Sequence, residues 1–254
     1  MTDKTNHEIH IPDIDVQMSD IYVPGVSINT VLFSYQNEKL NVLLLKFATT
    51  ESFMLPGGFI KREENIDDAA LRILSDRTGL DNIYLEQFYM AGKATRSVDD
   101  VVKQAIEELG YPEVKDWFDQ RMISGCYYAM VDESKLQPIV KERFISEFKW
   151  MDVNKLPDLL FDHNEIVEKA IDRLQLDMDR KLISNNLLQE PFTMPELRSL
   201  YEAVYQTKFT RSNFQRKMLG LGILDRVGKK HEGQANKAPY LYKFKKSKLH
   251  EPLE

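Results

Sequence analysis

Two adjacent glycines followed by an amphipathic segment constrain the fold of this chain more than any other feature. Gly57 and Gly58 end the run LPGG, and such a pair is typical of a tight turn, because glycine adopts backbone conformations that other residues avoid. Downstream, apolar residues recur with helical spacing at Ile66, Ala69, Ala70, Ile73 and Leu74. The segment therefore predicts a turn that leads into a helix with one core-facing side.

The spacing of this segment resembles the signature of the Nudix family, G-x5-E-x7-R-E-U-x-E-E-x-G-U, where U is aliphatic. Aligned without gaps, six residues fall on their positions: Gly58, Glu64, Arg72, Leu74, Gly79 and Leu80. The three other acidic positions hold Ile73, Asp76 and Arg77. The chain thus resembles a Nudix protein that has lost most of the acidic chemistry of its motif.

The missing acids bear on activity. In the family, residues three and four apart on this helix place carboxylates on one face, where they hold magnesium against the diphosphate under attack by water. Ile73 offers no oxygen, and Arg77 places a cation where a cation should bind. The resemblance therefore implies an α/β fold, a Nudix-like α/β/α sandwich with a mixed sheet, whose cleft binds without cutting. No catalytic residue, metal ligand or cofactor is expected.

Two alternatives remain open for this helix. Arg72 lies four residues from both Asp68 and Asp76, which is also typical of an ordinary surface ion-pair ladder. Alternatively, Glu64 and Asp76 hold magnesium in an active hydrolase of ADP-ribose-type nucleotide diphosphates. Magnesium is expected only under that alternative.

Length and composition suggest an ordinary protein of two domains. The chain has 254 residues, of which 43% are hydrophobic and 29% charged. Its one cysteine, Cys126, excludes an internal disulfide and lies in an apolar run, which predicts a buried thiol. The apolar run at residues 42–45 is too short to span a bilayer, and residues 1–15 are acidic without an apolar signal core. Cytoplasmic residence is therefore the expectation.

The first two thirds of the chain alternate strand and helix patterns, which predicts a mixed sheet with helices on its faces. Strands are expected at residues 26–33 and 42–47, which form a hairpin, and at residues 83–90, 122–131 and 148–151. The long connection at residues 93–120 has an apolar stripe of its own from Val98 to Leu109. Ser97 and Asp100 have capping spacing before that stripe, and Gly110 ends it.

Two further features flank the predicted sheet. Trp117 and Phe118 could form one wall of a ligand pocket or pack against the sheet. The run LPDLLFDHNEI resembles the end of the Nudix domain in the Nudix-related transcriptional regulators. Within it, Asp162 and Glu165 have capping-box spacing at the start of a helix, and His163 is interpreted as a hydrogen-bonded structural residue rather than a ligand.

The last sixty residues carry two consecutive helix starts. Thr193 and Glu196 form a capping box, with Phe192 and Leu197 at the staple positions, and Thr210 can cap the next helix. In that second helix the expected inward residues are Phe214, Met218 and Leu221. Two β-prone runs around a polar, basic loop follow, which is the element order of a winged helix-turn-helix, and the run NFQRKM resembles the second helix of the regulator subfamily.

The charge distribution favours a polyanionic partner for this module. Residues 192–254 hold 13 Lys and Arg against 6 Asp and Glu, a net charge of plus seven, while the rest of the chain is at minus thirteen. Side chains near the second helix start can contact base edges, and lysines of the wing suit phosphates. The candidate DNA-binding residues are Arg211, Asn213, Gln215, Arg216, Lys217, Lys229, Lys230 and Lys237.

Together these features predict a DNA-binding transcriptional regulator, expected to be a repressor. The predicted parts are a tail (residues 1–21), a Nudix-like effector-sensing domain (22–160), a linker helix (161–185) and a winged helix domain (186–250). The resemblance implies a homodimer, a double-stranded operator, and an effector that is an ADP-ribose-like nucleotide or a pentose sugar. The candidate effector-binding residues are Arg62, Glu64, Arg72, Arg96 and Arg121. A protein–protein adaptor remains the alternative for the C-terminal module.

Overall fold

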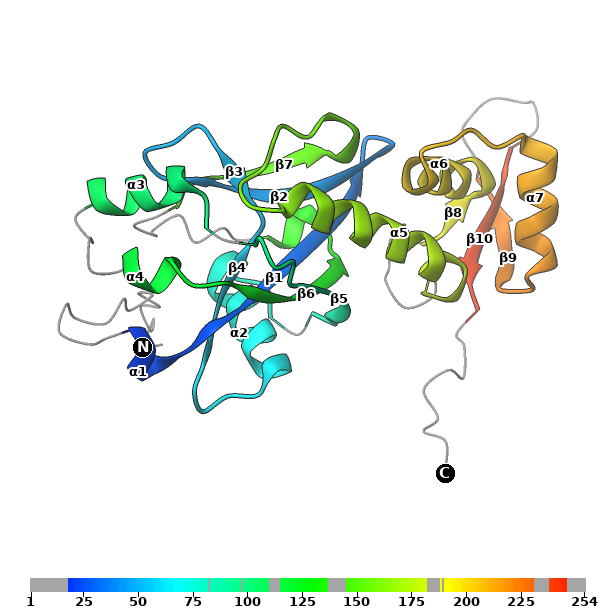
Figure 1. The fold of residues 1–254 in the computed structure, drawn as a ribbon. Helices are drawn as coiled ribbons and strands as arrows, with labels where there is room; N and C mark the ends of the chain where they lie inside the picture. Colours follow the sequence, from blue (N-terminus) through cyan, green and yellow to red (C-terminus); the bar gives the residue numbers. More distant parts are fainter. Residues whose placement is uncertain are drawn as a thin grey trace, which may run out of the picture. The chain divides into compact units, whose positions relative to one another are not determined.

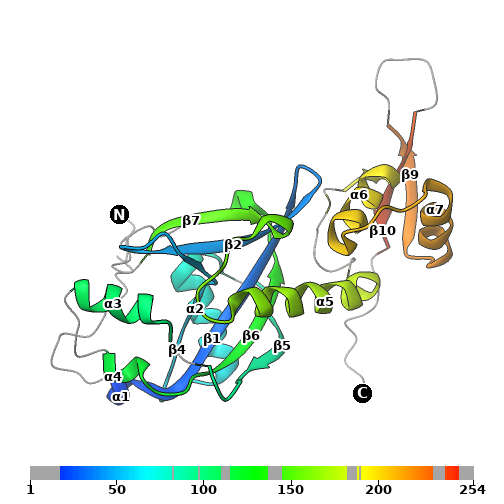
Figure 2. The same ribbon diagram turned by 45° about the horizontal axis from the view of Figure 1, so that its top comes forward.

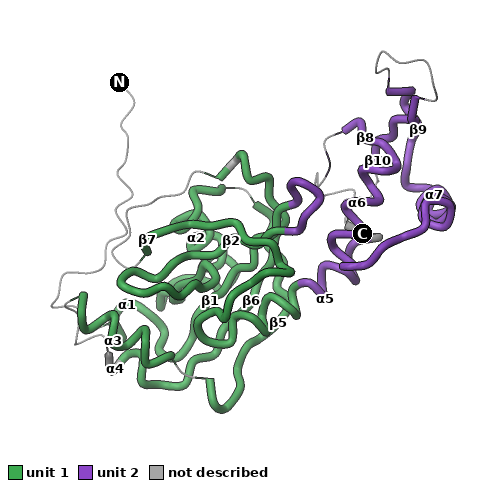
Figure 3. Tube along the Cα trace, turned by 90° about the horizontal axis from the view of Figure 1, so that it is seen from above, with its two compact units in different colours: residues 1–34, 41–170 green, residues 35–40, 171–254 purple. Residues whose placement is uncertain are grey.

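The computed structural model describes residues 18–81, 83–96, 98–109, 115–136, 145–181, 188, 190–230 and 238–245. Contacts divide the chain into two units, one of residues 1–34 and 41–170 and one of residues 35–40 and 171–254 (Figure 3). None of the described helices is long and apolar enough to cross a membrane.

The elements of the first unit alternate as the sequence predicts. Its strands are β1 (Tyr22–Gln36), β2 (Lys39–Phe47), β3 (Phe53–Met54), β4 (Gly57–Lys61), β5 (Glu86–Ala91), β6 (Ile123–Met130) and β7 (Ile145–Asp152). Its helices are α1 (Met18–Ile21), α2 (Ile66–Thr78), α3 (Asp100–Glu108) and α4 (Lys115–Phe118), with 3-10 turns at Glu133–Lys135 and Val153–Lys155. Helix α5 (His163–Lys181) begins in this unit and continues into the second.

Within the described residues, seven strands form one sheet in the order β3-β2-β1-β6-β5, with β4 paired to β1 and β7 to β2. Strands β1 and β6 are parallel and the other pairs antiparallel, so the sheet is mixed as expected. Helix α2 covers one face of the sheet and the start of α5 the other (Figures 1 and 2). This is the predicted Nudix-like α/β architecture.

The apolar stripe of α2 explains how that helix is held. Ala69, Ala70 and Ile73 pack with Ile28 of β1 and with residues of β4 and β6 in one buried cluster. Ile66, predicted to face the core, remains 36% exposed at the first turn of the helix. The core side of α2 therefore begins one turn later than the periodicity suggests.

The connection after β5 also folds largely as expected. Its helix α3 packs Val102, Ala105 and Ile106 against Phe47 of β2 in a second cluster. The helix starts after Asp99 at its N-cap position, without a side-chain capping bond. The capping pair predicted from Ser97 and the stop predicted at Gly110 fall on residues outside the described ones.

The second unit contains α6 (Met194–Tyr205), α7 (Arg211–Gly220) and a small antiparallel sheet of β8 (Phe192–Thr193), β10 (Tyr240–Phe244) and β9 (Leu224–Lys229), in that order. Strand β8 was not predicted, because two residues are too short for a periodic pattern. Phe214 and Met218 are buried as expected, but Leu221 is 39% exposed, since it follows the end of α7.

Candidate functional site

Gly57 and Gly58 lie in strand β4 rather than in the predicted tight turn, and the chain turns at residues 62–63 before α2. The glycines are instead explained by neighbouring atoms, which approach too closely for a larger residue. Gly57 pairs with Asn29 across β1 and β4, and a Cβ on Gly57 would lie 2.6 Å from the Ile28 carbonyl oxygen. A Cβ on Gly58 would lie 3.1 Å from Ile73 Cγ1. The two glycines therefore allow β4 and α2 to close against β1.

Arg72 gathers the two carboxylates that remain of the Nudix motif. Its Nε and Nη2 donate to the two carboxylate oxygens of Glu64 at 2.9 and 2.6 Å, and its Nη1 donates to Asp76 at 3.2 Å. Nη2 also donates to the Phe59 carbonyl oxygen at 2.9 Å. The predicted surface ladder with Asp68 does not form, because Asp68 instead accepts from Asn65.

The electrostatics of this pair follow from its geometry. Burial disfavours the ionised form of Glu64, but the hydrogen bonds from Arg72 and the Lys61 N–H outweigh burial and hold its pKa below the usual value. The same bond raises the pKa of Arg72 against the effect of burial. Both side chains are therefore charged at neutral pH, in a bidentate pair of the strongest kind.

Arg77 takes the position of the last acid in the motif. Its Nε donates to the Gly57 carbonyl oxygen at 3.0 Å, so the guanidinium lies against the start of strand β4. Burial lowers the pKa of Arg77 to about 10, which leaves the group charged at neutral pH. The positive charge of Arg77 is therefore fixed at the start of strand β4.

The motif residues do not fit the magnesium ion that the family implies. Ile73 is 2% exposed and packs in the core, while Glu64 and Asp76 are both engaged by Arg72. Hard divalent ions need several anionic oxygens at short range. Within the part of the chain that the structure describes, no three His, Cys, Asp or Glu side chains gather in a metal-binding group.

A polar network surrounds Asn29, the residue of β1 that pairs with Gly57 of β4. Arg96 Nε donates to both carboxylate oxygens of Asp162 at 2.9 Å, and its Nη2 lies 3.4 Å from Asn29 Oδ1. The Ser124 hydroxyl donates to Asn29 Oδ1 at 2.6 Å. Asn29 and Ser124 escaped the sequence analysis, because each lies inside an apolar strand with no motif to mark it.

His163 belongs to this network as a structural residue, as the sequence predicted. Its Nδ1 accepts the Leu55 N–H at 2.9 Å, and its Nε2 lies 3.2 Å from the side-chain amide nitrogen of Asn29. The ring is 2% exposed, and burial next to Arg96 lowers the pKa of His163 to about 3. The imidazole is therefore neutral, and its bond to Leu55 fixes the chain just before strand β4.

The start of α5 is held by ion pairs rather than by the predicted capping box. Asp162 binds Arg96, and Glu165 binds Lys93, so both carboxylates reach side chains of the 93–96 segment. Tertiary partners have thus replaced the local reciprocal bonds that the spacing suggested.

The predicted effector-binding residues divide into separate groups. Glu64 and Arg72 bind each other, while Arg96 lies next to Asn29 of strand β1. Arg62 and Arg121 are exposed and bind backbone instead: Arg62 Nε donates to the Ser19 carbonyl oxygen at 2.7 Å, and Arg121 Nη2 to that of Gly92 at 2.5 Å. No sequence pattern indicated these backbone partners.

The aromatic pair of the connection packs on Phe59 of strand β4. Trp117 is 7% exposed, and its ring meets Phe59 edge-on at 5.5 Å, while Phe118 lies 5.9 Å from Phe59. The packing alternative therefore describes these two side chains. Cys126 is fully buried, as expected, and burial raises the pKa of its thiol to about 12.

The second unit confirms the predicted capping box. The Thr193 N–H donates to the Glu196 carboxylate at 2.6 Å, and the Glu196 N–H donates to the Thr193 hydroxyl at 3.4 Å. Thr210 stands at the N-cap of α7 as predicted but makes no side-chain capping bond.

The basic residues of the second unit are not equivalent. On α7, Arg211, Asn213 and Arg216 are exposed and Gln215 is partly buried, with Arg216 Nη2 donating to Asn213 Oδ1 at 3.1 Å. Lys217 instead extends over the Tyr201 ring at 5.5 Å. In the wing, Lys229 is exposed, Lys230 pairs with Glu196 at 3.6 Å, and Lys237 lies outside the described residues.

Fold and site together define a Nudix domain joined to a winged helix domain. Residues 24–174 match the family model of the NUDIX domain, and residues 184–244 match that of the NrtR DNA-binding winged helix domain. The chain belongs to the Nudix family, and its winged helix is of the NrtR type.

Known relatives share this two-domain arrangement. The chain is 25% identical over 234 residues to the ADPR responsive transcriptional repressor NtrR of Acinetobacter baylyi, covering 90% of this chain and 85% of the relative. It is 26% identical to the crystal structure of Shewanella oneidensis NrtR, with a TM-score of 0.62 over 87% of this chain and 94% of that one. A MutT/nudix family protein from Enterococcus faecalis shares the fold at 21% identity and TM-score 0.63, over 91% and 90% of the two chains.

Proposed function

We propose that this protein is a DNA-binding transcriptional repressor whose Nudix domain binds an ADP-ribose-type nucleotide without hydrolysing it. The observation that carries the proposal is the state of the motif: Arg72 binds both remaining carboxylates, and Arg77 occupies a motif position where the family has a metal-binding acid. The site thus offers guanidinium groups to an anionic ligand, while its carboxylate oxygens are already engaged.

The choice of a nucleotide rests on charge and on the relative in Acinetobacter, which is described as ADPR responsive. Three guanidinium groups, those of Arg72, Arg77 and Arg96, bind β4 or its neighbour Asn29. Arginine is suited to diphosphates because its planar fork donates two parallel hydrogen bonds. A pentose without a phosphate has no group that matches this chemistry.

The DNA-binding half of the proposal rests on the second unit. Helix α7 exposes Arg211, Asn213 and Arg216, the residue types that pair with guanine and adenine edges. A 27mer DNA complex is known for the related NrtR of Shewanella oneidensis, which is 26% identical with a TM-score of 0.62. A homodimer on a palindromic operator completes the proposal, because a dimer matches two half-sites.

Hydrolysis is tested with purified full-length protein, ADP-ribose and magnesium. We expect no AMP, while calorimetry under the same conditions detects ADP-ribose binding. Turnover that disappears in Glu64→Gln would establish the hydrolase instead. A thermal-shift comparison of ADP-ribose with arabinose identifies the effector, since a specific ligand raises the melting temperature by mass action.

DNA binding is tested by gel shift on the DNA upstream of the protein's own gene. The double variant Arg211→Ala and Arg216→Ala should abolish the shift, whereas Lys155→Ala, an exposed lysine of the first unit, should retain it. Undisturbed binding by the double variant would favour an adaptor role for the C-terminal module. ADP-ribose added to the wild-type complex should release the DNA if the nucleotide is the effector.

A further inference from the structure

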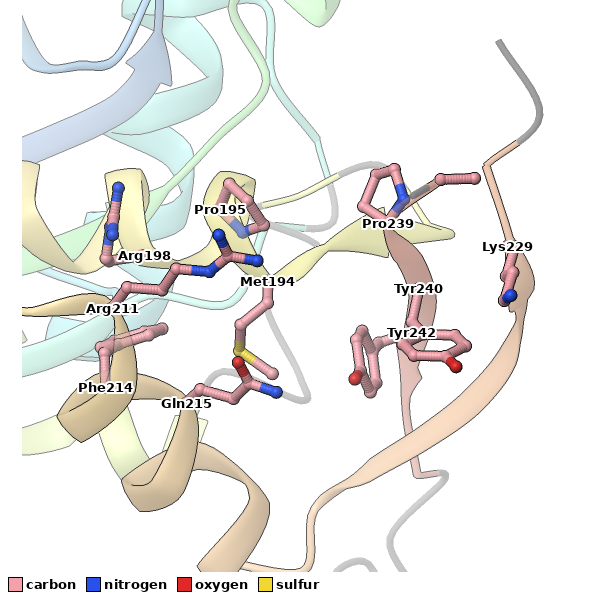
Figure 4. A pocket seen from close by; sticks show the side chains of 11 residues that line it. Met194, Pro195, Arg198, Arg211, Phe214, Gln215, Lys229, Pro239, Tyr240 and Tyr242 are labelled. Carbon is pink, nitrogen blue, oxygen red and sulfur yellow. The ribbon is translucent and has the colours of Figure 1, made fainter. Parts of the chain in front are cut away.

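The second unit contains a pocket of about 290 Å³ between its two short helices and its wing strands. Helices α6 and α7 and strands β9 and β10 all contribute to its lining (Figure 4). Its lining includes Met194, Arg198, Arg211, Phe214, Lys229 and Tyr242. None of the residues that line the pocket in the described part of the chain is acidic.

Three cations from three different elements meet at this pocket. Figure 4 shows Arg198 of α6 and Arg211 of α7 on one side and Lys229 of β9 on the other. Residues from separate elements line one pocket only through the tertiary fold, and here they give it a lining with three cations and no carboxylate in the described residues. Such a lining favours an anion.

The floor of the pocket is apolar. Met194, Phe214 and Tyr242 are 8%, 3% and 5% exposed, so their side chains are fixed by packing. A ligand that fits therefore carries an anionic group next to an apolar portion. A DNA backbone has this chemistry, since each phosphate is flanked by deoxyribose.

Arg198 is fixed from behind. Its Nε lies 3.4 Å from the carboxylate of Glu202, which itself accepts the Phe209 N–H and the Lys208 ammonium, both at 2.9 Å. These contacts lower the pKa of Glu202, so the carboxylate stays ionised. Even so, Arg198 Nε is buried and makes no hydrogen bond of good geometry within the described residues. The ion pair with Glu202 therefore holds the Arg198 side chain in place along the wall of the pocket.

We propose that this pocket holds a phosphate of the DNA backbone, bound by Arg198, Arg211 and Lys229. The inference rests on the proposed DNA-binding function and deepens it in two ways. It adds Arg198, which the sequence analysis missed, to the DNA-binding surface. It also assigns Arg211 to the backbone rather than to a base edge, leaving Asn213 and Arg216, two and five residues further along α7, to read sequence.

The assignment is tested by the salt dependence of binding to a short random-sequence duplex, measured with full-length protein. Each lost phosphate contact should reduce the slope of log K against log salt by about 0.9. We expect this decrease for Arg198→Met and for Arg211→Met, with a loss of affinity of roughly tenfold at low salt. Methionine keeps the aliphatic stem, and Lys155→Met is the matched control for removal of one exposed charge, with an unchanged slope expected.

A second measurement separates backbone from base contacts. In selection from a random duplex pool, Arg198→Met and Arg211→Met should recover the wild-type sequence, whereas Arg216→Met should recover an altered one. Arg198→Lys keeps the charge and should keep the wild-type slope, which covers the case in which Arg198→Met fails to fold by circular dichroism.

The outcomes are distinguishable. A wild-type slope in Arg198→Met that is folded, or a slope reduced as much in Arg198→Lys as in the neutral variant, overturns the phosphate pocket alone. An altered base preference in Arg211→Met overturns the assignment of that residue to the backbone. If the wild-type protein binds no duplex, the proposed function fails and this inference fails with it.

Discussion

Arg77 Nε donates a hydrogen bond to the carbonyl oxygen of Gly57 at 3.0 Å. The bond joins a motif position that is acidic in the Nudix signature to strand β4, which precedes the same helix. A fixed guanidinium therefore occupies a position where the family has a metal-binding carboxylate.

Nucleotide binding should not depend on magnesium. Because Arg77 supplies positive charge at the start of strand β4, calorimetry should give the same ADP-ribose affinity in EDTA and in magnesium. The variant Arg77→Met should weaken this affinity by about tenfold or more. Lys155→Met serves as the control with unchanged affinity. An affinity that rises clearly on adding magnesium would show that a metal site persists.

Glu64 should contribute to stability at neutral pH and lose that contribution in acid. Its pKa is depressed in the folded protein, so the stabilisation is present above its unfolded pKa and disappears as pH falls through the folded pKa. Glu64→Gln should lower the free energy of unfolding by about 1–3 kcal/mol at neutral pH. In urea titrations the difference from wild type should shrink below about pH 4.5; a constant difference would contradict the ion pair.

Ile73 should act as a core residue, although the Nudix signature has an acid there. The side chain is 2% exposed and packs against Gly58 of strand β4. Ile73→Ala should therefore lower the free energy of unfolding by about 2–4 kcal/mol. Leu71→Ala on the same helix is the control, because Leu71 is 45% exposed and its loss should cost about 0.5 kcal/mol or less. Chemical denaturation of both variants measures the contrast.

His163 should make the protein less stable as pH falls. The unfolded ring takes up a proton near its ordinary pKa of about 6.5, whereas the folded ring stays neutral down to about pH 3. Between these values stability should decrease by about 1.4 kcal/mol per pH unit from this group. His163→Gln should remove that slope, and a His163 imidazole that titrates by NMR near its ordinary pKa would refute the buried neutral state.

The two capping threonines should differ in their effect on stability. Thr193 accepts the Glu196 N–H, so Thr193→Ala should cost about 1 kcal/mol. Thr210 makes no side-chain capping bond, and Thr210→Ala should therefore cost less. Thermal melts of the two variants test this, and equal losses would show that position alone, rather than the bond, determines the effect.

Local and periodic features of the fold could be predicted from the sequence. The buried side of α2, the hairpin of β1 and β2 and the capping box of Thr193 each depend on neighbouring residues, and the structure confirms them. The tight turn predicted at Gly57 and Gly58 is wrong, because both residues are strand residues of β4. The replacement of acids by Ile73 and Arg77 is likewise visible in the sequence. It already indicated that the motif lacks the ligands of a metal ion.

Only the tertiary structure decided which partners the polar side chains take. Arg72 and Glu64 lie eight residues apart, Arg96 and Asp162 sixty-six, and Asn29 and His163 one hundred and thirty-four, and no periodic pattern records such pairings. The sequence likewise does not show that Arg62 and Arg121 donate to backbone carbonyls. Nor does it show that Arg198 lines one pocket with Arg211 and Lys229. Secondary structure follows from residues a few positions apart, whereas a site is assembled by the chain crossings that bring distant charges together.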